Sequence, residues 1–162
     1  HRGKPPNEIV GIGFKAMGYD GPTPGYKRRE GSFDPRAAFV FAGIGADEVI
    51  GDFGLVLGGA AGDEIDCLDY ALGTPPHALL LASATGHDEH YVPVIEDHRE
   101  MSKVVIVDQA SRVRADMVYF EGPNGGAVFS TGSISWCGSL SHNDYDNNVS
   151  RITENVLRNF LE

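Results

Sequence analysis

The chain has 162 residues, which is enough for one domain with a substantial hydrophobic core. Its 41% hydrophobic and 22% charged residues are ordinary proportions for a globular protein. The formal net charge of -10 argues against nucleic acid as a partner, because a phosphate backbone needs a basic surface. No apolar run approaches the length of a membrane span, and Cys67 and Cys137 lack a CxxC spacing. We therefore expect a cytoplasmic protein with reduced thiols and no membrane partner.

The first part of the chain alternates short apolar runs with loops. A strand is predicted at residues 8–14, after Pro5-Pro6, and a long loop at 18–36. Residues 37–43 are predicted to form a buried strand or a short helix, and 47–51 a turn or short strand.

A glycine-rich stretch at residues 54–62 leads directly into Asp63 and Glu64. Small residues let the backbone turn tightly and approach a ligand or a neighbour closely. Residues 65–72 are predicted to form a helical turn that ends at Gly73. This pair of acids after a tight loop is the first place to look for chemistry.

Apolar runs predict strands at residues 77–83, 104–108 and 115–121. Residues 91–100 are compatible with a helix or an extended segment. The sequence Gly-Pro-Asn-Gly-Gly at 122–126 predicts a hairpin from the strand at 115–121 into 127–130.

An amphipathic helix is predicted at residues 147–162, where apolar residues recur at spacings of three and four: Val149, Ile152, Val156 and Phe160. Asp144 and Asp146 are the predicted caps of this helix. Strands mixed with helices and buried runs indicate an α/β layer arrangement.

The last forty residues run from a strand through a Gly-Ser turn, Trp136 and a polar loop into a closing helix. This order resembles the C-terminal end of the large (beta) subunit of N,N-dimethylformamidase. Four upstream segments resemble the same family in the same order: 34–39, 50–55, 58–66 and 72–77. The resemblance covers nearly the whole chain, and the combination is specific although each segment alone is weak.

The resemblance implies a fold and a division of the molecule. The fold is α/β, a three-layer domain similar to class I glutamine amidotransferases (flavodoxin-like). Residues 1–162 would form the C-terminal portion of that single catalytic domain, with a terminal β-hairpin and a closing helix. The chain opens at His1 without an initiator methionine, and we expect it to be a piece of a longer subunit.

The resemblance also implies an activity. The family hydrolyses N,N-dimethylformamide to dimethylamine and formate, using a mononuclear iron held by two tyrosines and a carboxylate. The iron ligands are expected before His1, so we assign no metal ligand to this chain and expect it to be inactive alone. The expected partners are a small amide substrate, the remainder of the large subunit and the small subunit, in an oligomer.

Glu64 is the residue to which the resemblance assigns catalysis. Amide hydrolysis needs a base for the attacking water and an acid for the departing amine. One carboxylate can serve as both in turn if burial raises its pKa toward neutrality. On the residues alone, Asp63 and Glu64 are more simply read as caps of the helical turn at 65–72. The resemblance reverses this for Glu64 and leaves the capping role to Asp63.

Three further residues are candidates for the same site. His142 could orient the substrate or transfer a proton, although a loop histidine bonded to the start of the last helix is the simpler interpretation. Trp136 and Phe129 could line an apolar pocket around methyl groups, although aromatic residues beside a closing strand are more often core.

Other reactive side chains fit structural roles better. The run His87-Asp-Glu-His90 lacks a third ligand at a suitable spacing and is predicted to be a solvated loop. Cys137 lacks a nucleophile elbow and is predicted to be a small apolar residue. Four tyrosines match no ligand motif and stay unassigned: Tyr19, Tyr26, Tyr70 and Tyr91.

Two alternatives stay open. A non-catalytic amidotransferase-like module that binds sugar or protein would have the same fold, because fold does not determine function. An enzyme of the same family with another amide as substrate cannot be separated from the first hypothesis by sequence.

Overall fold

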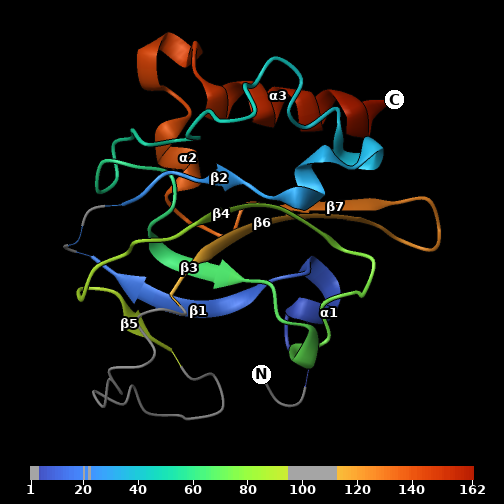
Figure 1. Ribbon diagram of the computed structural model, residues 1–162, viewed down its shortest axis with the longest axis horizontal. Helices are drawn as coiled ribbons and strands as arrows, with labels where there is room; N and C mark the ends of the chain where they lie inside the picture. The colour runs from blue at the N-terminus through green and yellow to red at the C-terminus, as the bar shows by residue number, and fades with distance from the viewer. Residues whose placement is uncertain (1–3, 20, 22, 95–112) are drawn as a thin grey trace.

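Figure 1 shows the computed structural model of the chain, in which residues 4–19, 21, 23–94 and 113–162 are described. The strands are β1 (Gly13–Gly18), β2 (Lys27–Arg28), β3 (Asp63–Cys67), β4 (Leu79–Ala84), β5 (Val92–Pro93), β6 (Ala115–Glu121) and β7 (Ala127–Ser130). The α-helices are α1 (Asn7–Val10), α2 (Trp136–Ser139) and α3 (Asn148–Leu161). Short 3-10 turns lie at Glu30–Phe33, Pro35–Ala37, Tyr70–Leu72 and His142–Tyr145.

The strands form two sheets, one with the order β3-β1-β5 and one with the order β2-β4-β6-β7. Every pairing between the described strands is antiparallel. A flavodoxin-like sheet is parallel, and no parallel pair occurs in the part of the chain that the structure describes. The amidotransferase-like architecture, with 1–162 as part of one catalytic domain, therefore stays a prediction about a larger unit.

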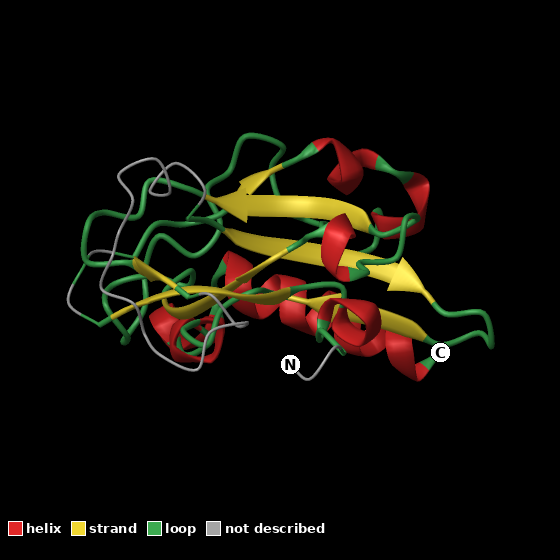
Figure 2. Ribbon diagram, turned by 90° about the horizontal axis from the view of Figure 1, so that it is seen from below, coloured by secondary structure: helices red, strands yellow, loops and turns green. Residues whose placement is uncertain are grey.

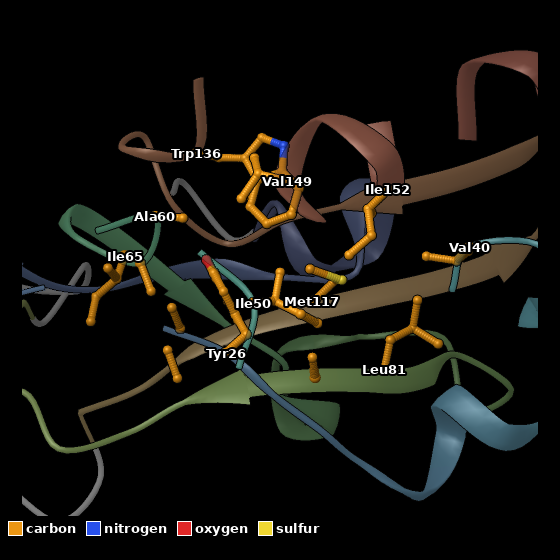
Figure 3. Packing of buried hydrophobic residues seen from close by; sticks show 14 of the residues in the cluster. Tyr26, Val40, Ile50, Ala60, Ile65, Leu81, Met117, Trp136, Val149 and Ile152 are labelled. Atoms are coloured by element: carbon orange, nitrogen blue, oxygen red, sulfur yellow. The ribbon is translucent and has the colours of Figure 1, made fainter. Parts of the chain in front are cut away.

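β6 is the central strand of the core, and its first six residues are all buried. On one of its faces Met117 packs in a cluster with Leu81 of β4 and with Ile152 of α3. Figure 2 shows α3 running along the sheet. Figure 3 shows Val149 and Ile152 of α3 pointing into the hydrophobic cluster. On the other face Val118 packs with Ile12 and Leu68. This burial on both faces explains the continuous run of large hydrophobic and aromatic residues at 117–120 in β6.

β3 joins the two sheets through the segment that follows β7. The Asp66 N–H donates to the Gly132 carbonyl at 3.0 Å, while β1 pairs along the other edge of β3. Gly132 has a φ of 71°, and a Cβ there would lie 2.9 Å from the Asp66 carbonyl oxygen. Only glycine suits this crossing, because it tolerates both the left-handed backbone and the close approach.

Several elements predicted from the sequence are confirmed. β4 corresponds to the strand predicted at 77–83, and β6 to the strand predicted at 115–121. The predicted hairpin joins β6 to β7, with Tyr119 opposite Phe129. The helix predicted at 147–162 is α3, with Val149, Ile152 and Val156 buried. Among the described residues no helix is long and apolar enough to cross a membrane.

Two predictions for the first part of the chain are wrong, one in the boundary of a strand and one in the type of structure. The run at 8–14 begins as the helical turn α1, which Gly11 ends in the left-handed conformation with a φ of 79°. A left-handed glycine is a common helix stop, so the strand starts only at Gly13. Residues 37–43 form neither a strand nor an α-helix. They make successive turns, such as Val40 N–H to the Ala37 carbonyl, and these turns bury Ala37, Val40 and Phe41.

The helical turn predicted at 65–72 is wrong in its first part because of long-range pairing. Residues 63–67 form β3 rather than the start of a helical turn, with Ile65 and Cys67 buried in alternation. The 3-10 turn at Tyr70–Leu72 is the helical part of that segment. The undecided segment at 91–100 begins with β5. Its remainder from residue 95, and the strand predicted at 104–108, lie outside the described residues.

Candidate functional site

The glycine-rich loop leads into β3, and its last residue, Gly62, is tightly packed. Gly62 is buried, and a Cβ at this position would lie 2.6 Å from the Tyr91 hydroxyl oxygen. Asp63 follows with a φ of 64°, in the left-handed region that non-glycine residues seldom adopt. Such strained residues occur at functional sites, where surrounding contacts hold them. The backbone directly before Glu64 is therefore a constrained turn.

Glu64 lies in β3 with its backbone held on both sides. Met17 of β1 is its partner across the sheet, and the Ile134 N–H donates to its carbonyl oxygen at 3.2 Å. The residue itself is exposed. Glu64 therefore lacks the burial that its predicted acid–base role calls for, and that role stays a prediction about this residue in the complete protein.

Asp63 does not cap a helix, so the capping role predicted for it is wrong. It is the first residue of β3, and no helix begins at Ile65. The physical reason is the pairing of β3 with β1 and with residues 132–134, which captures the backbone N–H groups that a helix would have left free.

His142 lies in the 3-10 turn before α3. Its ring stacks on Phe53, with the ring centroids 4.2 Å apart and the planes 18° from parallel. Its carbonyl oxygen accepts a hydrogen bond of 2.7 Å from the Asn147 side chain at the start of α3. The simpler interpretation from the sequence, a loop histidine bonded to the helix start, is confirmed through the carbonyl rather than the ring. Among the described residues no hydrogen bond or ion pair joins His142 to Glu64.

Trp136 and Phe129 both lie against the core. Trp136 is only 5% exposed, and its indole N–H donates to the Thr153 hydroxyl at 3.1 Å. It also meets Tyr26 edge to face, with the ring centroids 5.8 Å apart, and Figure 3 places it beside Val149. Phe129 is half-buried and packs against the same cluster. Contact of either residue with a substrate stays a prediction.

Three cavities among the described residues lie away from Glu64, His142, Trp136 and Phe129. One of about 470 Å³ is lined by Lys15, Cys67, Tyr70, Arg114 and their neighbours. Burial raises the pKa of the Cys67 thiol to about 11, so this cysteine stays protonated at neutral pH. Neither this cavity nor two others, beside Phe33 and beside Leu157, includes the four predicted site residues.

His87 was placed wrongly in a solvated loop. It is only 9% exposed, its Nε2 donates to the Ala61 carbonyl at 2.8 Å, and its ring meets Tyr91 edge to face. His90 is exposed and pairs with Asp88 at 3.1 Å, as a polar loop residue does. Four polar residues in a row carry no periodicity, so the sequence offered no signal that one of them turns inward.

A buried carboxylate at the start of β6 pairs with a half-exposed arginine, and this pair was missed from the sequence. Asp116 is fully buried and accepts hydrogen bonds from the Arg114 side chain at 2.8 Å and from the Ser83 hydroxyl at 2.7 Å. The available signal was a carboxylate inside an apolar strand with an arginine two residues before it. Buried charges of this kind need a partner, so the pair is structural.

The described residues offer no iron site built from His, Cys, Asp or Glu side chains alone. They contain no group of three or more His, Cys, Asp or Glu side chains that could hold a metal ion. The Tyr26 hydroxyl is buried and donates to the Thr131 carbonyl at 2.7 Å, and burial raises its pKa, which disfavours a tyrosinate.

Comparison with known proteins adds the family. Residues 1–147 match the family model described as N,N-dimethylformamidase beta subunit-like, C-terminal. The chain is 47% identical over 162 residues to the N,N-dimethylformamidase beta subunit of Paracoccus aminophilus, and 46% identical to that of Alcaligenes sp. Each match covers 99% of this chain and 21% of the relative, so the chain spans about a fifth of the length of these relatives. By the match of its first 147 residues and these identities, the chain belongs to the N,N-dimethylformamidase beta subunit-like, C-terminal family.

Proposed function

We propose that this chain is a segment of an amidohydrolase that cleaves N,N-dimethylformamide or a similar small amide into an amine and formate. The observation that carries the proposal is Glu64, an exposed carboxylate on a backbone held between β1 and residues 132–134. The names of the relatives supply the reaction class, and the carboxylate supplies a group able to perform it.

In the proposed reaction, Glu64 moves one proton twice. The carboxylate takes a proton from water as the water oxygen attacks the amide carbonyl carbon. It then gives that proton to the amide nitrogen as the carbon–nitrogen bond breaks, so an amine leaves instead of an amide anion. Water is consumed, one amine and one carboxylic acid are formed, and Glu64 is regenerated.

We further propose that the rest of the molecule completes the site. The relatives are about five times as long as this chain and are named as beta subunits. The iron that the family resemblance implies would be held by residues outside the described ones, in the larger amidotransferase-like domain. A small subunit and the remainder of the large subunit would be the partners of this chain.

The test is Glu64→Gln in the complete enzyme, assayed by release of dimethylamine from N,N-dimethylformamide. We expect turnover to fall by about 10²- to 10⁴-fold, the usual contribution of general acid–base catalysis. Iron content and assembly should be unchanged. Glu154→Gln is the matched control, because Glu154 is an exposed glutamate paired with Arg158 on α3.

Two outcomes would count against the proposal. Normal turnover in Glu64→Gln would remove Glu64 from the mechanism. A complete wild-type protein that binds no metal and releases no amine from small amides would favour the alternative, a non-catalytic binding module.

A further inference from the structure

Ser133 ties the segment after β7 to the end of the glycine-rich loop. The Gly62 N–H donates to the Ser133 hydroxyl oxygen at 2.8 Å, and the same hydroxyl donates to the Gly62 carbonyl oxygen at 2.9 Å. The Ser135 N–H also donates to the Ser133 hydroxyl oxygen, at 3.1 Å. A serine hydroxyl has one proton to donate and two lone pairs, so its hydrogen-bonding capacity is fully used.

Gly62 has few other ways to satisfy its peptide groups. It is buried, and the space beside its α-carbon is taken by Tyr91 and Thr23. Buried N–H and C=O groups need a partner, and here one side chain serves both. The Ser133 hydroxyl therefore holds the backbone of Gly62, the residue before Asp63, in place.

A second attachment lies on the other side of Asp63. The N–H of Ile134, the residue after Ser133, donates to the Glu64 carbonyl oxygen at 3.2 Å. Asp63, with a φ of 64°, is thus held between two bonded neighbours, Gly62 and Glu64. A residue in a sparsely populated conformation persists only where its surroundings determine it. Since the turn at Asp63 sets the direction in which β3 starts, it also sets where the Glu64 carboxylate points.

We propose that Ser133 is a positioning residue for Glu64, acting through the backbone of Gly62 and Asp63. The inference rests on the proposed function of Glu64. It predicts that Ser133 influences the chemical step rather than substrate binding.

The test uses Ser133→Ala in the full-length subunit, assembled as the active enzyme, with N,N-dimethylformamide as substrate. We expect kcat to fall by about 10- to 100-fold while KM stays within about twofold, because a misplaced catalytic group weakens only the transition state. An unchanged kcat, or an effect confined to KM, would overturn the proposal. Ser133→Cys is the second variant if Ser133→Ala does not assemble. A thiol is a poorer donor and acceptor, so kcat should also fall, and an unchanged kcat would again overturn the proposal.

Ser135→Ala is the matched control. The Ser135 hydroxyl is buried two residues further on, and it has no hydrogen-bond partner among the described residues. Its removal should leave kcat unchanged, and equal losses in Ser133→Ala and Ser135→Ala would overturn the proposal. Amide hydrogen exchange of the peptide spanning 58–66 should be faster in Ser133→Ala than in Ser135→Ala, and equal exchange would overturn it too.

Failure of this inference can be told apart from failure of the proposed function. If Glu64→Gln keeps normal turnover, the role of Glu64 is wrong. If Glu64→Gln loses turnover while the Ser133 variants keep theirs, only the positioning role is wrong.

Discussion

Ile134 donates its backbone N–H to the carbonyl oxygen of Glu64, so a residue beyond the last strand holds the candidate catalytic residue in place. Four of the described strands, β4, β5, β6 and β7, lie between the two residues in the sequence. The geometry of the glycine-rich loop therefore depends on completion of the C-terminal segment. Four predictions follow from this contact and from others that the tertiary structure makes.

Substitutions at Asp63 should change the free energy of unfolding according to how well each residue adopts the left-handed backbone. Asp63→Val is expected to lower the free energy of unfolding by about 1–2 kcal/mol, because a β-branched residue is strained at this positive φ of 64°. Asp63→Gly should cost little or nothing, since glycine adopts this conformation freely. Urea unfolding measures both. Equal losses would mean that the Asp63 carboxylate, rather than its backbone, matters.

Removing the buried carboxylate of Asp116 should be severe. Asp116→Ala leaves the Leu68 N–H and the Ser83 hydroxyl without the buried carboxylate, and it removes the ion partner of the half-exposed Arg114. Each buried group left unpaired typically costs about 1–3 kcal/mol. Glu154→Ala removes an exposed carboxylate from its pair with Arg158 and should lose a small fraction of that. Urea unfolding of the two variants gives the comparison, and similar losses would contradict the structural role of Asp116.

The stability of the chain should decrease in mildly acidic solution because of His87. Burial lowers the pKa of His87 below its usual value of 6.5, against the opposing effect of its hydrogen bond to the Ala61 carbonyl. Below about pH 6.5 the unfolded chain binds a proton on this ring that the folded chain does not bind. The stabilisation is therefore complete above pH 6.5 and is lost as the pH falls toward the lowered pKa.

The measurement for His87 is the free energy of unfolding at pH 7.5 and pH 5.5, for the wild type and for His87→Phe. Carboxylates titrate in both proteins, so the difference between the two pH dependences isolates His87. The variant should show the flatter profile. Parallel profiles would show that His87 does not contribute.

Asn147 is the N-cap of α3, so the prediction of Asp144 and Asp146 as its caps is wrong. Its side-chain oxygen accepts from the Ser150 N–H at 2.9 Å, and its amide group donates to the Leu140 and His142 carbonyls. Asn147→Ala is expected to lower the free energy of unfolding by about 1–2 kcal/mol. Asp146→Ala is the control and should lose clearly less. The reverse order would restore the cap predicted from the sequence.

Local patterns were enough to predict the elements whose partners are close or whose periodicity is long. The hairpin of β6 and β7 follows from alternating runs around an Asn-Gly turn, and α3 follows from apolar residues on one face over four turns. The family was also accessible, because its segments occur in order along nearly the whole chain.

Local patterns did not predict the structure where contacts with distant segments determine it. Residues 63–67 read as polar and turn-like, yet they form β3 because β1 and residues 132–134 pair with them. His87 turns inward because the Ala61 carbonyl and the Tyr91 ring provide a place for it. Propensity is a weak guide in such segments, since strand formation depends on neighbours far along the chain.

The sequence by itself therefore determined the family, the core strands β4 and β6, the closing helix and the choice of Glu64 as the residue to test. Only the tertiary structure decided that Glu64 lies on a strand, with Asp63 in a left-handed turn and Ser133 attached to Gly62. The physical reason is that periodicity records which face of a segment is buried, whereas hydrogen bonds between distant segments decide how the backbone is held.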